Sequence, residues 1–210
     1  MYESYYGLKE NPFNVTPDPQ YVYFGENHRE ALAQLLYGVQ EKKGFIVLTG
    51  EVGTGKTTLV HYLLDKLNHG STQTKTAFLF NPKLTVNDFI EYILKDLGLQ
   101  VHGGTKGDHL HLLHEGLINY YKNGERVVLI IDEAQNLTSK QMKTLITRAG
   151  PGTKIVCIGN LSQIDTPYLT ATTSGLTYVV DRFKTWPHGA HITLLRGERS
   201  RLADYASDIL

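Results

Sequence analysis

A glycine-rich turn at residues 50–57 has the composition and spacing of a loop that binds phosphate. It runs Gly-Glu-Val-Gly-Thr-Gly-Lys-Thr, follows the pattern G-x-x-x-x-G-K-T, and comes directly after an apolar run at residues 45–49. Glycines let the backbone curl so that successive N–H groups point inward, and the helix expected next adds its positive N-terminal end. Lys56 would reach the β- and γ-phosphates, and the Thr57 hydroxyl would coordinate Mg²⁺. The predicted nucleotide-binding residues are Gly50, Glu51, Val52, Gly53, Thr54, Gly55, Lys56, Thr57 and Thr58.

Two adjacent carboxylates, Asp132 and Glu133, follow a wholly apolar run at residues 127–131. Such a run is typical of a buried strand, which would deliver both acids to the functional edge of a parallel sheet. Asp132 would hold Mg²⁺ through water, and Glu133 would accept a proton from the water that attacks the γ-phosphate. The alternative, that the acids only cap the next helix, has less weight beside an intact phosphate loop. Together the two motifs correspond to Walker A and Walker B and favour an ATP hydrolase over a small-molecule kinase.

A polar segment at residues 159–165, Gly-Asn-Leu-Ser-Gln-Ile-Asp, follows the fourth expected strand. Because parallel strands end at one edge of a sheet, this third site is expected beside the nucleotide. Asn160 or Gln163 would position the attacking water or sense the γ-phosphate. A plain polar turn is the competing interpretation, since Asn, Gly and Ser favour turns for local reasons.

Four arginines in the C-terminal part of the chain are candidates for stabilising phosphate charge during hydrolysis, within the chain or on a neighbouring subunit. They are Arg148, Arg182, Arg196 and Arg199, and for each alone a surface salt bridge is the competing interpretation. The predicted catalytic residues are Lys56, Glu133, Asn160, Gln163 and Arg199, and the predicted metal ligands are Thr57 and Asp132.

Two further patterns carry less weight. Residues 105–108, Thr-Lys-Gly-Asp, match the string by which GTPases recognise guanine, but they precede the acid pair and follow no strand, so ATP is the predicted nucleotide. His102, His109, His111 and His114 lie in one segment without carboxylates or cysteines at ligand spacing. A solvated helix face is therefore expected there rather than a metal site.

Strands and helices must alternate to bring these residues to one edge. Apolar runs predict strands near residues 45–49, 76–80, 127–131, 154–158 and 191–195. Helices are expected at residues 27–39, after 55, at 85–97, 110–121, 138–150 and 175–183, and from 198, with capping boxes at 27–30 and 138–141. This order predicts an α/β fold with a five-stranded parallel sheet covered by helices on both faces.

The composition defines the broad class. The chain has 210 residues, of which 41% are hydrophobic and 20% charged, and this excludes a disordered or collagen-like chain. The single Cys157 excludes an internal disulfide framework, and no apolar run approaches the roughly 18–20 residues of a membrane span, so we expect a cytoplasmic protein without membrane insertion. Lys and Arg number 12 against 16 Asp and Glu in residues 1–136, and 9 against 5 in residues 137–210. A basic half can attract polyanions, but no dense block of Lys and Arg occurs, so ordinary scatter of surface charge is the competing interpretation.

Residues 1–137 resemble the ExeA/GspA-type secretion ATPases of the AAA+ class. The similar segments are residues 6–8, 11–13, 16–19, 28–32, 44–45, 49–57, 80–84 and 130–137. The resemblance implies a P-loop ATPase with sheet order 5-1-4-3-2. It also implies that the N-terminal arm, around Pro12, Phe13 and residues 21–24, packs near the adenine, with a hydrophobic clamp on the core as the alternative.

Residues 132–210 resemble the C-terminal ATPase half of PhoH-like proteins, which are related to superfamily-one RNA helicases. The similar segments are residues 147–150, 152–156, 163–165, 167–169, 174–180, 182–183 and 197–200. Residues 132–137 fit both families, so the two likenesses meet within the acid motif. One departure lies at the third site, where the PhoH-like pattern has Gly-Asp before the Gln and this chain has Asn160.

These observations predict one P-loop NTPase domain over residues 1–210, with an arm at 1–26, an ExeA-like half at 27–137 and a PhoH-like half at 138–210. A chimera of two families, natural or engineered, is our hypothesis for this organisation. The predicted function is Mg²⁺-dependent binding and hydrolysis of ATP. Three classes remain open: a motor or switch ATPase with a protein partner or homo-oligomeric state, an RNA-stimulated ATPase or helicase, and a nucleotide-binding fold with little or no turnover.

Overall fold

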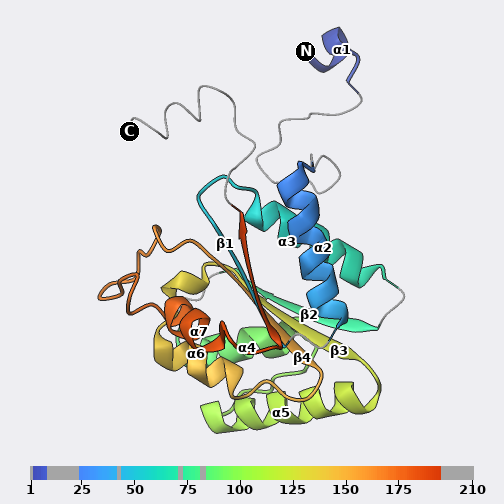
Figure 1. The fold of residues 1–210 in the computed structure, drawn as a ribbon. Coiled ribbons are helices and arrows are strands. Elements are labelled where there is room, and N and C mark those ends of the chain that lie inside the picture. The colour runs from blue at the N-terminus through green and yellow to red at the C-terminus, as the bar shows by residue number, and fades with distance from the viewer. Residues whose placement is uncertain (1, 9–23, 42–43, 71–72, 81–83, 195–210) are drawn as a thin grey trace.

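Five parallel strands lie at the centre of the molecule in the order β2-β3-β4-β1-β5 (Figure 1). Their bounds are β1 Phe45–Gly50, β2 Thr74–Leu79, β3 Arg126–Ile131, β4 Thr153–Gly159 and β5 Gly189–Leu194. This is the predicted order 5-1-4-3-2 counted from the other edge, so the predicted fold is confirmed. The computed structural model describes residues 2–8, 24–41, 44–70, 73–80 and 84–194.

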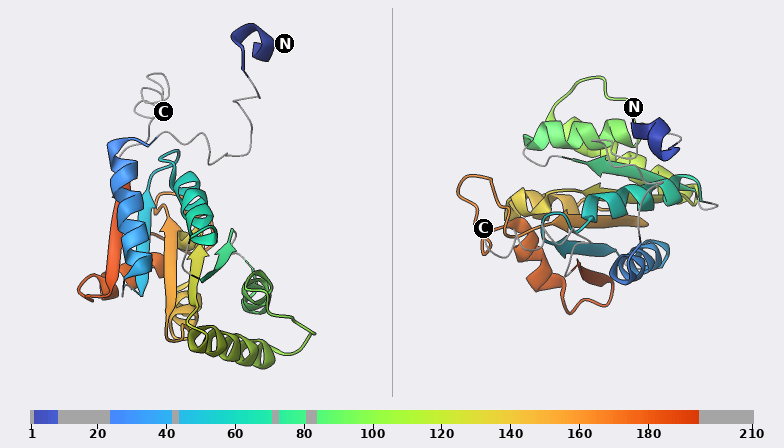
Figure 2. Two further views of the ribbon diagram at one scale, coloured as in Figure 1. Left: turned by 90° about the vertical axis from the view of Figure 1, so that its right-hand side faces the viewer. Right: turned by 90° about the horizontal axis from the view of Figure 1, so that it is seen from above.

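Helices cover both faces of this sheet (Figure 2). The helices of the described ranges are α1 Tyr2–Tyr6, α2 Glu26–Gln40, α3 Lys56–Asn68, α4 Val86–Asp96, α5 Lys106–Lys122, the 3-10 helix η2 Ala134–Asn136, α6 Ser139–Ile146 and α7 Gly175–Phe183, and α1 belongs to neither layer. Helices α2 and α3 pack on one face, and α4, α5, α6 and α7 pack on the other. None of the described helices is both long and apolar enough to cross a membrane.

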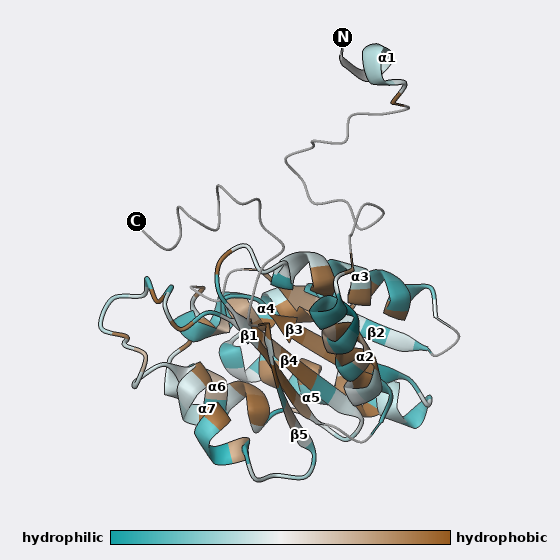
Figure 3. Cartoon of the chain, turned by 45° about the horizontal axis from the view of Figure 1, so that its top comes forward, coloured by the Kyte–Doolittle hydropathy of each residue, from teal (hydrophilic) through white to brown (hydrophobic). Residues whose placement is uncertain are grey.

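The strands are buried on both faces of the sheet because side chains alternate along a strand. Successive side chains point to opposite faces, so Ile46 and Leu48 of β1 pack with α2 and α3, whereas Phe45 and Val47 pack with α4 to α7. All five residues from 127 to 131 in β3 are buried, as a strand covered on both faces requires. Figure 3 shows these hydrophobic strands between helices with hydrophilic outer surfaces.

Helices α4, α6 and α7 begin where predicted, with Thr85, Thr138 and Ser174 as their capping residues. The predicted capping box at residues 27–30 is wrong. Helix α2 already begins at Glu26, because the carbonyl of Gly25 accepts the first helical hydrogen bond, from the Arg29 N–H.

Two other helix boundaries differ from the prediction. Helix α5 begins at Lys106 rather than near 110, because Thr105 and Asp108 form a capping box. Helix α6 ends at Ile146 rather than at residue 150, since the Arg148 and Ala149 N–H groups bond three residues back and tighten the chain into turns. The helix predicted from residue 198 lies outside the described residues.

The loops after β1, β3 and β4 leave the sheet at its carboxyl edge, because the three strands are parallel neighbours. Residues 50–55, 132–138 and 160–174 form these loops. The fold therefore gathers the phosphate loop, the acid pair and the third site along one edge.

Candidate nucleotide site

The phosphate loop, residues 50–57, connects β1 to the first turn of α3. Gly53 and Gly55 have φ angles of 72° and 77°, a conformation that residues with a Cβ rarely adopt. A Cβ on Gly50 would lie 2.9 Å from both the Leu194 carbonyl oxygen and the Thr54 hydroxyl oxygen. The curled backbone thus requires glycine at all three positions.

Lys56 folds its side chain back over this loop. Its Nζ donates to the carbonyl oxygens of Gly50 at 2.8 Å and Glu51 at 2.6 Å. Burial lowers the pKa of Lys56, while the carboxylates of Asp132 and Glu51 raise it. The ammonium group is thus held at the mouth of the loop, where a phosphate would meet it.

The phosphate loop and the acid pair meet through Thr57 and Asp132. The Thr57 hydroxyl donates to Asp132 Oδ2 at 3.3 Å, although the two residues are 75 positions apart. Burial raises the pKa of Asp132, and the opposing influences are the Glu133 N–H, the Thr57 hydroxyl and the charges of Lys56 and His61. The half-buried carboxylate is therefore held by specific partners at the loop.

These oxygens fit a magnesium ion. Mg²⁺ prefers hydroxyl, carboxylate, phosphate and water oxygens and usually takes only one or two protein carboxylates. Thr57 and Asp132 supply one hydroxyl and one carboxylate side by side. In the described residues, no group of three or more His, Cys, Asp or Glu side chains is placed to hold a metal ion, so the phosphate oxygens and water would complete the coordination of this one.

Glu133 lies in a different environment from its neighbour Asp132. It is exposed and adopts the left-handed conformation, with φ 51° and ψ 34°, and it precedes η2. Its N–H donates to Asp132 Oδ1 at 2.9 Å and so fixes this sharp turn. Asp132 is therefore hydrogen-bonded to the phosphate loop, whereas Glu133 is exposed to solvent. These different environments allow the two acids to have separate roles.

At the third site, Asn160 is buried and hydrogen-bonded from several sides. Its N–H donates to Gln135 Oε1 at 3.1 Å, its side-chain amide donates to Gln163 Oε1 at 3.3 Å, and its Oδ1 accepts from the hydroxyl of Ser162 at 2.7 Å. Gln135 also donates to the carbonyl oxygen of Gln163 at 3.3 Å. The segment is thus tied to η2, which directly follows the acid pair.

The rest of the loop between β4 and α7 is attached to the same segment. The Asn136 side chain accepts from the Asp165 N–H and the Thr166 hydroxyl, both at 3.1 Å. The buried Ser174 hydroxyl donates to the Gln135 carbonyl at 2.8 Å. The sequence did not predict that Gln135 and Asn136 hold this loop. The only signal in the sequence was their position close behind the acid pair.

The two arginine candidates within the described residues, Arg148 and Arg182, do not lie together. Arg182 lies 3.7 Å from the ring centroid of Tyr178 and donates to its carbonyl oxygen. Arg148 borders a pocket beside Thr153, the first residue of β4, at the sheet edge opposite the phosphate loop. Neither is therefore placed at the phosphate loop of its own chain, and Arg196 and Arg199 lie outside the described residues.

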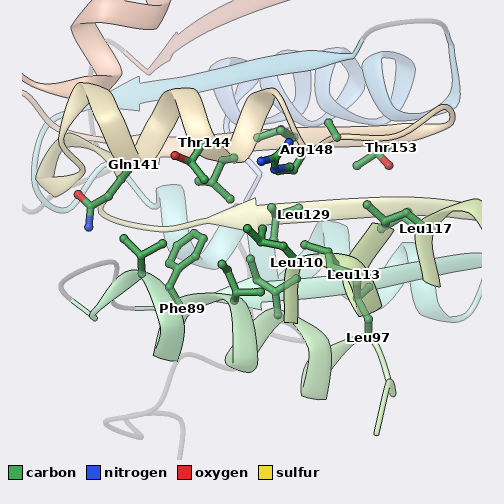
Figure 4. Close-up of a pocket in the computed structure, with 17 residues that line it drawn as sticks. Phe89, Leu97, Leu110, Leu113, Leu117, Leu129, Gln141, Thr144, Arg148 and Thr153 are labelled. Atoms are coloured by element: carbon green, nitrogen blue, oxygen red, sulfur yellow. The ribbon is translucent and has the colours of Figure 1, made fainter. Parts of the chain in front are cut away.

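That pocket encloses about 640 Å³, part of it open to solvent, between α4, α5 and α6 (Figure 4). Its walls are mainly apolar side chains such as Phe89, Leu113 and Leu129. Gln141 of α6 and Arg148, two residues beyond that helix, lie at its border. It lacks the clustered backbone donors of the phosphate loop and is not part of the candidate nucleotide site.

The remaining sequence patterns have structural explanations. Residues 105–108 form the capping box of α5 and not a guanine-binding motif. The expectation of a fully solvated histidine face is wrong for His109, which is buried and lies 3.1 Å from the side-chain oxygen of Asn87. His102, His111 and His114 are exposed. Within the N-terminal arm, residues 9–23 lie outside the described residues, and the ring of Phe24 packs edge-on against Tyr62 at a centroid distance of 4.8 Å.

A glycine-rich loop between a parallel strand and a helix, with a strand-end acid against the hydroxyl of its last residue, defines a P-loop NTPase. Residues 39–164 match the model of the AAA domain family, and residues 124–205 match that of the PhoH-like proteins. The chain belongs to the AAA domain family of P-loop ATPases and carries a segment that is similar to the PhoH-like family. The two matches overlap at residues 124–164.

Two curated relatives reflect the same dual likeness. General secretion pathway protein A of Aeromonas hydrophila is 41% identical over 145 residues, covering 65% of this chain and 25% of the relative. Protein PhoH2 of Bacillus subtilis is 37% identical over 204 residues, covering 82% of this chain and 44% of the relative. The chain thus spans less than half the length of these relatives.

Solved structures support the fold. The ORC1 protein of Aeropyrum pernix in complex with DNA is 16% identical, with a TM-score of 0.57 over 92% of this chain and 49% of that one. Cdc6p of Pyrobaculum aerophilum is 19% identical, with a TM-score of 0.56 over 87% of this chain and 48% of that one. At these identities the likeness concerns the fold alone.

Proposed function

We propose that this chain binds Mg·ATP at residues 50–58 and hydrolyses it. The observation that carries the proposal is the contact between Thr57 and Asp132, which joins the phosphate loop to the acid pair. A site for a triphosphate and its cation needs backbone donors, a lysine, a hydroxyl and a carboxylate at one place. All four lie together at the carboxyl edge of the sheet.

In this proposal, Lys56 exchanges its contacts with the loop carbonyls for oxygens of the β- and γ-phosphates. Thr57 and Asp132 hold Mg²⁺, which neutralises charge on the phosphates. Glu133 accepts a proton from the attacking water. At the same time the water oxygen bonds to the γ-phosphorus, and the bond between the γ-phosphorus and the ADP oxygen breaks. Exposure of Glu133 beside Asp132 suits this role, because its carboxylate has room for a water molecule.

Asn160 and Gln163 would position that water or sense the γ-phosphate, and their bonds to Gln135 link them to the acid pair. Arg199, from the same chain or a neighbouring copy, would stabilise charge in the transition state. We treat residues 1–210 as one domain whose ExeA-like and PhoH-like parts join near residue 137. A homo-oligomer with a protein partner that alters turnover fits this arrangement.

A second candidate function is an RNA-stimulated ATPase, favoured by the PhoH-like match over residues 124–205. Adding single-stranded RNA at low salt would then raise the ATPase rate, and the increase would decline as salt screens the phosphate contacts. An RNA-independent rate under the same conditions argues against this second candidate.

Hydrolysis is tested by measuring phosphate release from ATP by the wild type and by Glu133→Gln. We expect the variant to bind ATP normally while its kcat falls by about 10²–10⁴-fold, since the glutamine cannot accept the proton. Glu115→Gln, at an exposed position on α5, is the matched control and should be unaffected. Equal turnover in Glu133→Gln and wild type would contradict the role of Glu133, and no turnover in either would favour the non-hydrolysing alternative.

A further inference from the structure

A buried histidine outside both nucleotide motifs contacts the phosphate loop. His28 of α2 is 7% exposed, and its Nε2 lies 2.8 Å from the carbonyl oxygen of Thr54, itself 2% exposed. A carbonyl oxygen only accepts hydrogen bonds, so Nε2 carries the proton. Among the described residues, Nδ1 of this ring is buried without a partner. The Nε2–H is therefore the group of this ring that holds the loop.

This contact fixes the orientation of one peptide unit of the loop. The described chain has no cis peptide bonds, and in a trans peptide the C=O and the next N–H point in opposite directions. With the Thr54 carbonyl turned toward His28, the Gly55 N–H is turned away from it. Backbone N–H groups at this place in a phosphate loop are the donors that hold phosphate.

Gly55 lies close to the imidazole ring of His28, where a side chain would not fit. Its φ of 77° suits glycine, and a Cβ there would lie 3.0 Å from His28 Nε2. Two independent constraints, backbone conformation and the close approach of His28, therefore exclude a side chain at this position.

Helix α2 is itself held firmly against the core that carries the loop. Phe24, just before the helix, packs edge-on against Tyr62 of α3 at a centroid distance of 4.8 Å. Ala31, Leu35 and Val39 are buried in the same cluster as β1 and α3. The position of His28 is thus set by packing and not by the loop it touches.

We propose that His28 is a positioning residue: by donating to the Thr54 carbonyl, it holds the 54–55 peptide so that the Gly55 N–H faces the phosphate site, which makes phosphate affinity depend on the placement of α2. The inference rests on the proposed nucleotide binding. In this proposal His28 acts only through the phosphate loop and makes no contact with the base of the nucleotide.

Three substitutions separate donation from packing. His28→Leu fills the space without a donor, His28→Gln places an amide N–H near the position of Nε2, and His28→Asn has the same amide on a shorter arm. We expect His28→Leu and His28→Asn to bind both MgATP and inorganic tripolyphosphate about tenfold more weakly than wild type, and His28→Gln to stay within about threefold. Thermal melts of each variant check that the fold is intact.

A second readout needs no ligand. Amide hydrogen exchange at Gly55 in the nucleotide-free protein should be faster in His28→Leu and His28→Asn and near the wild-type rate in His28→Gln. Unchanged exchange in His28→Leu overturns the inference, as does loss of affinity for ATP without loss for tripolyphosphate. If wild type binds neither ligand, the proposed nucleotide binding fails, and the exchange measurement alone decides whether His28 orients the peptide.

Discussion

The phosphate loop and the loop between β4 and α7 lie at the same edge of the sheet but are built in opposite ways. In residues 50–57, glycine backbone geometry and backbone carbonyls hold the functional side chain, Lys56. The backbone of residues 160–174 is held by polar side chains, such as Asn160 within the loop and Asn136 of η2. A site shaped by its backbone has a sequence pattern that identifies it, whereas one shaped by side-chain contacts has the composition of an ordinary turn.

The largest effect is expected at the backbone-built loop. Lys56→Ala removes the cation that charge-assisted hydrogen bonds to phosphate require, so the Kd for MgATP should rise about 100-fold or more in calorimetric titrations. Lys66→Ala, at an exposed position in the last turn of the same helix, is the matched control. Near-equal Kd values for Lys56→Ala and wild type would show that the loop does not bind the triphosphate.

The next effect concerns the anchor of the second loop. A Cβ on Gly175 would lie 2.7 Å from the Thr138 carbonyl oxygen and 2.8 Å from that of Leu137, and backbone cannot easily move away. Gly175→Ala should therefore lower the free energy of unfolding by about 1–3 kcal/mol. Gly107→Ala in α5, where the nearest atom is 3.5 Å away, should instead be neutral or stabilising by up to about 1 kcal/mol. Denaturant unfolding measures both, and equal stabilities would refute the close packing at residue 175.

A smaller effect tests whether the side-chain network serves catalysis. Gln135→Leu keeps the volume but removes the bonds to Asn160 and Gln163. We expect kcat to fall by about tenfold with the Kd for ATP unchanged. Gln34→Leu, on the exposed face of α2, is the control. A normal kcat in Gln135→Leu would show that residues 160–163 are a polar turn without a role in catalysis.

The smallest effect concerns Asp132 and pH. Burial raises the pKa of this carboxyl above its ordinary 3.8, so between 3.8 and the raised value the native state holds more protons than the unfolded state. Stability of the nucleotide-free protein should therefore fall as pH rises through that window. Asp132→Asn should melt slightly above wild type at pH 7, with the difference vanishing as pH falls toward 3.8, while Asp181→Asn, at an exposed position, should show no such dependence. A lower melting temperature for Asp132→Asn at pH 7 would contradict this electrostatic explanation.

Local patterns were sufficient to predict much of the molecule. The apolar runs defined all five strands, and the phosphate-loop and acid motifs lie together as their order along parallel strands required. The helix starts at Thr85 and Thr138 followed from capping chemistry, because a cap depends on a few adjacent residues. The start of α2 was not predicted by capping chemistry, because the carbonyl of Gly25, and not a side chain at residue 27, accepts the first hydrogen bond of the helix.

The features that were missed depend on contacts between distant residues. Nothing near His28 in the sequence indicates a bond to Thr54, which is 26 positions away. The bonds of Gln135 to residues 160 and 163 likewise form only once β3 and β4 are neighbours. Arg148 and Arg182 lie away from the phosphate loop for a similar reason, because residue type gives no information about which edge of the sheet an arginine occupies. The roles of Arg196 and Arg199 stay predictions, since both lie outside the described residues.

Isothermal titration of ATP into the wild-type protein, with and without Mg²⁺, tests most directly whether one site joins the phosphate loop to Asp132. We predict saturable heat with one ATP per chain, tighter binding with Mg²⁺, and loss of that Mg²⁺ enhancement in Asp132→Ala. No heat of binding, or equal affinities with and without Mg²⁺ in wild type, would contradict the joint site.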